Sequence, residues 1–362
     1  MTRSLDRKLF EVIEDKKIPK LIKLKKIKYL VNLGANFDAI YQGKSSLTVA
    51  SELNEEEVVA FLEEKGAKKI VLSEEQRNQL GAELYLALKN DKNEEAIDLI
   101  EAGANLEYIS EDDKEFGGRN IMMMAIFKNN KDMVRKLIYE GFRIDTPNNN
   151  GTRAIHTAFK EGSKEILDVL IEAGADIDIK DDNGYTSLIW AATLCKEEIV
   201  DVLLDNKAKL NEQNNNGMTA LNCACWKCNA DITKRLVEAG ADIEVVDRSG
   251  ETPLITACEM DGLNVATILV NNKANLNVRG GTNGWTPLMH AAFNGNNDLV
   301  KLLIANGADE SMKSTCGVRL MSMAKDEETK KVIVEAVRTR DSQKNKRSNI
   351  ISRLKGSILG RN

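Results

Sequence analysis

The 362-residue sequence has little of what most enzymes and secreted proteins use. It contains only two histidines, His156 and His290, so the usual acid–base and metal chemistry has few side chains to draw on. Six cysteines are too sparse for a disulfide framework, and aromatic residues make up only 5%. No uncharged apolar run approaches the roughly 18 to 20 residues that span a bilayer. These absences argue against a histidine-dependent enzyme, a disulfide scaffold and a membrane-spanning protein.

The two ends of the chain are basic and its body is acidic. Residues 1–30 hold ten Lys/Arg against four Asp/Glu, and residues 338–362 hold eight against one. The overall net charge of −5 therefore leaves −18 on the residues between them, which would repel nucleic-acid phosphates. We expect no nucleic-acid binding by this body. Because Met1 to Lys17 is charged throughout, we also expect no signal peptide and a cytoplasmic protein with reduced cysteines.

What the sequence does contain is an internal repeat of about 33 residues. A leucine recurs with spacings of 32, 37, 38, 33, 33, 33, 33 and 34 residues, and an alanine column follows it in the same register. Units carry Gly-x-Thr/Ser-x-Leu before the alanine and then close with Gly-Ala-Asp/Asn. A period of this length is typical of stacked supersecondary units. The leucines are Leu30, Leu62, Leu99, Leu137, Leu170, Leu203, Leu236, Leu269 and Leu303.

Each unit is predicted to be a pair of short antiparallel helices. Thr252 and Thr286 can cap a helix through their hydroxyls, and Pro253 and Pro287 then occupy the first helical position, where a missing N–H does no harm. A second apolar set with helix-face spacing is followed by a glycine stop. Asn-rich stretches such as Asn214–Gly217 supply the positive φ of a tight connection. One helix pair cannot bury its apolar face alone, so the units must stack into a solenoid.

With these motifs the chain resembles the ankyrin-repeat family. The family's Gly-x-Thr-Pro-Leu-His-x-Ala signature is approached by Gly151–Ala158 and, with the histidine displaced by one position, by Gly284–Ala291. The resemblance implies an all-α ankyrin-repeat solenoid of stacked helix-turn-helix units joined by hairpin-like fingers, with about nine units including imperfect ones. Longer connections are expected at 71–81 and 107–117, where the repeat spacing rises.

The same register predicts the organisation of the chain. Residues 1–337 form the solenoid, with an N-terminal cap at 1–36, repeats at 37–311 and a C-terminal cap at 312–337. The seven lysines between Lys16 and Lys28 are interpreted as the solvated face of a cap helix. Residues 338–362 form a basic tail that we expect to be disordered. Because its apolar residues have helical spacing, binding to a partner groove or to an anionic membrane stays open as an alternative.

Two units depart from the glycine stop after the second helix. Lys207 and Lys273 stand where the other units have glycine, and each follows an asparagine. A non-glycine residue in the left-handed region costs on the order of 1 kcal/mol. We therefore expect these two junctions to be softer than their neighbours.

Apparent chemical motifs are explained better by the repeat. Cys223, Cys225 and Cys228 could suggest a metal site. On a helix, however, Cys223 lies about 160° around the axis from Cys225 and about 140° from Cys228, so the three thiols cannot converge on one metal ion. Gly43-Lys44-Ser45 copies the end of a phosphate-binding loop, but Asp38 stands where that loop needs glycine. The two histidines occupy or adjoin the structural slot of the signature. We expect no catalytic residue, no metal and no cofactor.

The resemblance places partner binding on the fingers and on the ends of the first helices. Trp, Tyr and Met are enriched at interface cores, and several of them fall in these positions. The function predicted is a non-catalytic protein–protein interaction adaptor or scaffold binding another protein. The alternative is a membrane-associated regulatory or secreted effector protein that uses its basic tail. The candidate partner-binding residues are Tyr185, Met218, Trp226, Arg248, Glu251, Met260, Arg279, Trp285 and Phe293.

Overall fold

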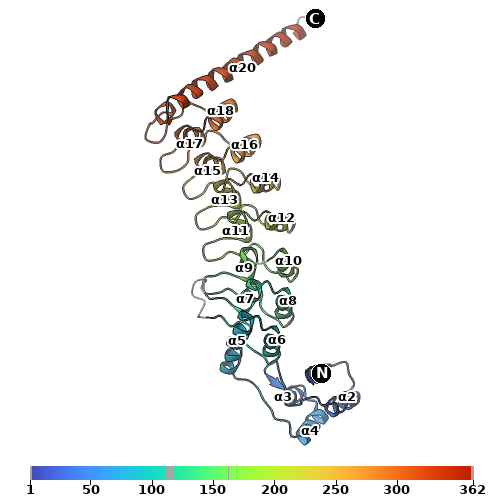
Figure 1. Cartoon of the computed structure of the whole chain (residues 1–362). Helices are drawn as coiled ribbons and strands as arrows, with labels where there is room; N and C mark the ends of the chain where they lie inside the picture. Colours follow the sequence, from blue (N-terminus) through green and yellow to red (C-terminus); the bar gives the residue numbers. More distant parts are fainter. Residues whose placement is uncertain (1, 111–117, 162, 360–362) are drawn as a thin grey trace. The chain divides into compact units, whose positions relative to one another are not determined.

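The computed structural model describes residues 2–110, 118–161 and 163–359, and Figure 1 shows them as a succession of helix pairs joined by loops. The described strands are limited to β1 (Ile40–Tyr41) and β2 (Lys44–Ser45), which pair antiparallel. Contacts between residues divide the chain into two compact units, Met1–Ala175 and Asp176–Asn362. Within the described residues, no helix combines the length and the apolar composition needed to cross a membrane.

The first unit contains helices α1 to α10. Sequential helices pack as pairs, and α7 of one repeat packs against both α5 and α9 of its neighbours. This arrangement is that of the stacked units expected from the sequence. The helices are α1 (Thr2–Glu14), α2 (Lys20–Asn32), α3 (Ser46–Glu52), α4 (Glu56–Glu64), α5 (Glu74–Lys89), α6 (Asn93–Glu101), α7 (Ile121–Phe127), α8 (Lys131–Tyr139), α9 (Ala154–Glu161) and α10 (Lys164–Glu172).

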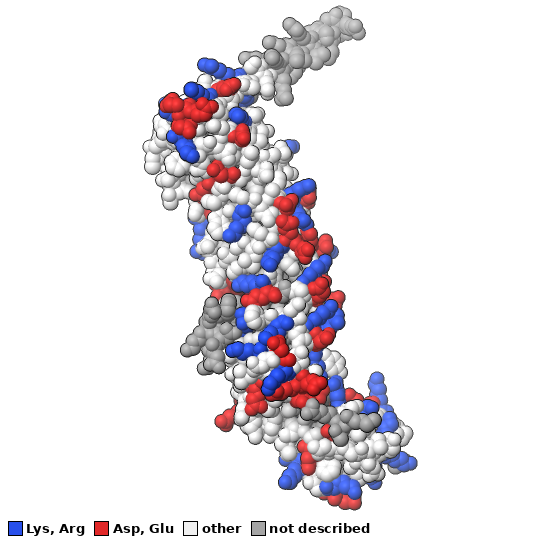
Figure 2. All heavy atoms as spheres, in the orientation of Figure 1, with Lys and Arg blue, Asp and Glu red and all other residues white. Residues whose placement is uncertain are grey.

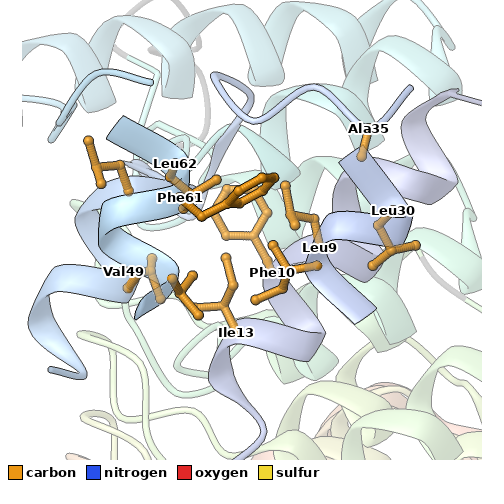
Figure 3. Packing of buried hydrophobic residues seen from close by; sticks show 12 residues of the cluster. Leu9, Phe10, Ile13, Leu30, Ala35, Val49, Phe61 and Leu62 are labelled. Atoms are coloured by element: carbon orange, nitrogen blue, oxygen red, sulfur yellow. The ribbon is translucent and has the colours of Figure 1, made fainter. Parts of the chain in front are cut away.

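The N-terminal four helices share one hydrophobic cluster. Leu9, Phe10 and Ile13 of α1 are buried against residues of α2, α3 and α4, including Leu62, as Figure 3 shows. Burying such side chains stabilises the fold by roughly 1.5 to 3 kcal/mol each. α1 and α2 are thus a packed helix pair within the range expected for the N-terminal cap.

Lys23 corrects the interpretation of the N-terminal lysines as a uniformly solvated face. Its side chain is only 2% exposed, because Nζ reaches the carbonyl of Ile13, 3.0 Å away, and the Glu55 carboxylate. A buried ammonium needs such partners, since its desolvation would otherwise be costly. Lys25 and Lys28 on the same helix are exposed, as expected.

α5 corrects the expected long connection at 71–81. The helix begins at Glu74 because Ser73 and Gln76 form a capping box, in which each side chain accepts a hydrogen bond from the backbone N–H of the other residue. α5 has 16 residues, compared with seven in α3 and in α7, so most of the expected connection is helical. The second expected connection, 107–117, falls largely outside the described residues, since 111–117 are not among them.

The second unit, taken by itself, shows the same kind of stacking. The first helices α11, α13, α15 and α17 pack in sequence, and α19 and α20 pack against α17 and α18. Thr186, Thr219, Thr252 and Thr286 cap the first helices as predicted, with Pro253 and Pro287 in the first helical position. The helices are α11 (Ser187–Thr193), α12 (Glu197–Asp205), α13 (Ala220–Trp226), α14 (Ala230–Glu238), α15 (Pro253–Glu259), α16 (Leu263–Asn271), α17 (Pro287–Asn294), α18 (Asn297–Ala305), α19 (Leu320–Met323) and α20 (Glu327–Leu359).

Backbone conformation confirms the register at the helix ends. Lys207 and Lys273 have φ angles of 62° and 67°, in the left-handed region where neighbouring repeats place glycine. Cys195 and Cys228, which end the first helices, also have positive φ, at 55° and 53°. Asp261, after α15, has a φ of 61°, so five non-glycine residues of this unit carry backbone strain after helix ends.

α20 differs from the expectation of a disordered tail at 338–362. The helix runs from Glu327 to Leu359, because its N-terminal half packs against α18 and no glycine or proline interrupts the sequence before Gly356. Arg340 fixes this half through paired hydrogen bonds to the Glu310 carboxylate, at 2.7 and 2.8 Å. The side chains of 344–362 lie outside the described residues, so the tail's expected amphipathic face is not placed.

Candidate functional site

The fingers before α11, α13 and α15 are each held in shape by a single side chain. In the repeat of α15, Asp247 Oδ1 accepts hydrogen bonds from the backbone N–H groups of Ser249 (2.8 Å) and Glu251 (2.9 Å). Asp181 and Asn214 do the same in the two preceding repeats. Such a turn presets the backbone of the residue that follows the finger glycine.

Successive fingers of the second unit are joined by backbone hydrogen bonds. One N–H of each finger donates to a carbonyl of the finger before it, so the tips form a regular ladder. This ladder holds the residue after each finger glycine at a repeated position. The bonds run from Asn215 to Asn183 (2.9 Å), from Arg248 to Asn216 (2.9 Å), from Gly281 to Ser249 (3.0 Å) and from Thr315 to Asn283 (3.0 Å).

Within a repeat, the residue after the finger glycine faces the residue eight positions later, at the end of the first helix. Trp285 and Phe293 make such a pair, with ring centroids 5.1 Å apart. Glu251 and Glu259 occupy the equivalent positions one repeat earlier, and both line a common hollow. In these two repeats, the finger and helix-end positions expected to bind a partner therefore adjoin each other.

These two pairs enclose a hollow that we call the acidic–aromatic pocket. Its volume is about 290 Å³, and α15, α17 and the finger between them form its walls. A neighbouring, more open hollow is lined by Met260, Phe293 and Met323. The acidic–aromatic pocket is lined by Glu251, Glu259, Gly280, Gly281, Thr282, Asn283, Trp285, His290, Phe293 and Asn294.

The titratable groups of the acidic–aromatic pocket are perturbed in opposite directions. Burial raises the pKa of Glu251 to about 7, and the negative charges of Glu259 and Asp247 add to this effect. Burial lowers the pKa of His290 to about 4, so its imidazole is neutral near pH 7. Its ring contacts Trp285 edge-on at 5.0 Å between centroids. The pocket thus holds shared negative charge and no histidine cation.

The other predicted residues occupy the same surface with different surroundings. Tyr185 packs on Trp190, with ring centroids 4.6 Å apart, and is half-buried. Met218 is also half-buried, and Trp226 is 45% exposed with the Lys227 ammonium 4.2 Å from its ring centroid. Arg248 and Arg279 are exposed on the fingers. The structure thus brings Glu251, Trp285 and Phe293 into one pocket and leaves Tyr185 in a separate aromatic contact.

Comparison with known families identifies the fold. The model of the family described as ankyrin repeats (3 copies) matches residues 84–181, 170–247 and 229–314. The chain belongs to the ankyrin-repeat family. Ankyrin repeats are generally protein–protein interaction modules and are typically non-catalytic. The all-α ankyrin-repeat solenoid expected from the sequence is confirmed.

Solved ankyrin domains share this architecture. The ankyrin repeat domain of Bcl-3, described as a unique member of the IkappaB protein family, is 29% identical, with a TM-score of 0.54 over 60% of this chain and 97% of that one. The human ASB11 ankyrin repeat domain is 22% identical, with a TM-score of 0.53 over 60% of this chain and 98% of that one, and shows the fold alone. No curated protein matches the chain.

Glu259 lies at a helix-end position of the repeat register but is not among the nine candidate partner-binding residues. It stands nine positions after the finger glycine, in the same ankyrin column as Trp226 and Phe293, which were both selected. Candidates in that column were predicted from the enrichment of aromatic and methionine side chains at interfaces, which does not select a carboxylate. The sequence does place Glu259 eight positions after Glu251, the same spacing as between Trp285 and Phe293. That spacing could have predicted that the two carboxylates lie close together.

The cysteines of these ankyrin repeats are free. Cys223, Cys225 and Cys258 are buried, and burial raises the pKa of the Cys223 thiol to about 11. Such thiols behave as small apolar side chains rather than nucleophiles. In the residues that the structure describes, no three histidine, cysteine or acidic side chains come together as a metal site.

Proposed function

We propose that this ankyrin protein is a non-catalytic adaptor or scaffold of the cytoplasm. It binds another protein through the fingers and first-helix ends of residues 185–293. One observation carries the proposal: Trp226, Met260 and Phe293 are 45%, 37% and 54% exposed on this surface, although aromatic residues are scarce in the chain. Aromatic and methionine side chains are enriched in the cores of protein interfaces.

The finger ladder supports the same proposal. Backbone hydrogen bonds between fingers order this surface before a partner arrives, so little conformational entropy is lost on binding. A specific interface would bury about 800 Å² on each partner. Binding at equilibrium, without a chemical step, is what such a preordered surface supports.

Affinity capture tests the proposal directly. The full chain and a Trp226→Ala/Trp285→Ala/Phe293→Ala variant, shown by circular dichroism to be folded, are used to capture proteins from a lysate of the source cells. The matched control is Ile97→Ala/Tyr139→Ala/Val334→Ala, which removes three exposed apolar side chains from helices α6, α8 and α20. We expect one partner to be kept by the parent and the control and lost by the first variant.

Equal capture of every protein by the parent and the triple variant would contradict the proposed surface. In that case the partner would bind to the caps, the second helices or the tail. The alternative role at a membrane depends on residues 338–362, and most of their side chains lie outside the described residues. Its test is co-sedimentation with anionic liposomes of the full chain and of residues 1–343, which keep Arg340 and its contact with Glu310.

A further inference from the structure

We propose that the acidic–aromatic pocket binds the cationic end of a lysine or arginine side chain supplied by the partner protein. The inference rests on the proposed function and adds the chemistry of one anchor. The carboxylates of Glu251, in the finger before α15, and of Glu259, at the end of α15, form one wall. The rings of Trp285 and Phe293 form the other. A cation between them gains both Coulomb attraction and contact with an aromatic face.

The charges of the pocket are not balanced by the chain itself. Among the described residues, neither Glu251 nor Glu259 forms an ion pair, and Asp247 adds a further negative charge beside them. The nearby Lys325 ammonium donates instead to the carbonyl of Asn294, at 3.1 Å. By contrast, Asp201 and Glu197 of α12 in the same unit pair with Arg235 of α14, and Figure 2 shows mixed charges over these helices.

Two adjoining carboxyl groups without a counter-ion are unfavourable in the isolated protein. A bound ammonium or guanidinium would remove this cost, because it pairs with both carboxylates at once. His290 does not compete for this role, since burial lowers its pKa to about 4 and keeps it neutral. The histidine therefore supplies no positive charge to pair with the two carboxyl groups.

The first unit of the chain shows how the same positions hold a cation. Arg119 follows a finger glycine, as Glu251 and Trp285 do, and its guanidinium lies 4.1 Å from the ring centroid of Phe127, eight positions later. The same guanidinium is 3.4 Å from the carboxylate of Glu161 in the next repeat. Finger, aromatic helix end and carboxylate thus enclose a cationic side chain there. The acidic–aromatic pocket offers the aromatic and acidic parts of this arrangement without the cation.

The test uses the three tryptophans of the full chain as separate reporters. Labelling with 5-fluorotryptophan gives one ¹⁹F signal each for Trp190, Trp226 and Trp285, and Trp285→Phe assigns the signal of the pocket. The probes are the capped pentapeptides Gly-Gly-Lys-Gly-Gly and Gly-Gly-Arg-Gly-Gly, with norleucine in place of lysine as the uncharged control. We expect a saturable shift of the Trp285 signal with both basic peptides and none with norleucine, while the Trp190 signal stays fixed.

Charge variants make the test specific. Glu251→Gln/Glu259→Gln should weaken binding of the basic peptides at least tenfold. Glu198→Gln/Glu238→Gln removes the same charge from exposed sites on α12 and α14 and should leave binding unchanged. An equal response to norleucine, or equal weakening by both double variants, would overturn the inference.

Two further outcomes separate this inference from the proposed function. If the partner is captured but Trp285 does not respond to the basic peptides, the pocket has no cation specificity and only the inference fails. If the peptides bind but no partner depends on the surface, the proposed function fails and the pocket stands as a cation site. A Trp285 shift that grows with protein concentration and without peptide would identify a second copy of the chain as the occupant, which overturns the assignment to a partner protein.

Discussion

At the scale of single residues, Lys207 and Lys273 show how much a repeat tolerates at a glycine position. Both lysines have positive φ at the end of a second helix. Glycine adopts this conformation without strain, so Lys207→Gly and Lys273→Gly should each stabilise the protein by about 1 kcal/mol. Thermal unfolding should show an increase of about 2–4 °C for each variant.

The reverse change is the matched control. Gly240 occupies the equivalent position after α14, with φ of 94° and open space around an added Cβ, so Gly240→Ala introduces backbone strain without a steric clash. It should lower the melting temperature by a similar amount. Unchanged melting in both lysine variants would contradict the strain assigned to these positions.

Glu251 makes the stability of the protein depend on pH. Its pKa in the folded chain is raised to about 7, so the folded state holds a proton that the unfolded chain releases near pH 4.5. The resulting stabilisation is present below pH 4.5 and is lost as the pH rises through 7. Glu251→Gln, which cannot ionise, should therefore melt higher than the parent at pH 8, with a smaller difference at pH 5.

Melting curves at the two pH values check this prediction. Glu238→Gln on α14, an exposed site, should change the melting temperature equally at pH 5 and pH 8. A Glu251→Gln effect that is the same at both pH values would show that the carboxyl pair is not under charge repulsion. That result would also remove one argument for the cation-binding pocket.

The N-cap residues of the helices could be predicted one by one from the sequence, whereas the acidic–aromatic pocket could not. Thr252 and Thr286 act on backbone N–H groups three positions away, so their role is written in the local sequence. Whether Glu251 and Glu259 lie close to Trp285 depends on how one repeat packs against the finger of the next. Sequence register identified the positions of Glu251 and Trp285, but it did not show that they face one hollow with Glu259.

At the scale of elements, Lys23 joins three helices of the N-terminal cluster. From α2 it reaches the carbonyl of Ile13 near the end of α1 and the carboxylate of Glu55, which precedes α4. Lys23→Ala would leave the half-buried Glu55 carboxylate without its cation. We expect a loss of about 3–5 kcal/mol in the unfolding free energy of this cluster.

Hydrogen exchange of the full chain measures this loss in the amides of α1, α2 and α4. Lys25→Ala, at an exposed position of the same helix, should leave exchange in these helices unchanged. Equal protection in the two variants would mean that the Lys23 ammonium contributes no net stability.

α5 shows where the repeat register misled the interpretation of an element. Ser73-Glu74-Glu75-Gln76 is a capping-box sequence, and it starts the helix at Glu74. The expected connection at 71–81 came from comparing this repeat with its shorter neighbours. The local helix signal was present in the sequence and was the better guide.

At the scale of the whole molecule, Arg340 attaches the C-terminal helix α20 to the last repeat. Its guanidinium holds Glu310 and also donates to the carbonyl of Ala308 at 3.3 Å, so α20 is attached to the last repeat loop. A chain ending at residue 343 should melt like the full chain. One ending at 337 should lose about 1.5–3 kcal/mol, because it lacks this charged contact.

Single substitutions distinguish the contact from the helix length. Arg340→Ala should reproduce most of the loss, whereas Arg338→Ala, at an exposed position of the same turn, should not. The measurement is thermal unfolding of the two shortened chains and the two substituted chains, each compared with the full chain. A destabilised 1–343 chain would place part of the cap beyond Arg340 and contradict this account.

The fold of the whole chain followed from periodicity, because every repeat uses the same local rules. The leucine and alanine columns at 33-residue spacing specified stacked helix pairs, and the helix pairs of α11 to α18 follow them closely. The length of the C-terminal helix could not be predicted in this way, because the repeat period carries no information about where a terminal helix ends. For α20, the decisive contact is that of Arg340 with Glu310, across about 30 residues.

The finger ladder also has a consequence for how such a chain can change over generations. Gly217 and Gly250 have equivalent backbone conformations, and the fingers before them make equivalent bonds to their predecessors. A gene that lost the codons from Gly217 to Ser249 would join Asn216 to Gly250 and rebuild a complete finger at the seam. Duplicating the same stretch would add one repeat. The length of this protein can therefore be altered by recombination in whole steps of 33 codons while the backbone hydrogen bonds of the finger ladder are kept.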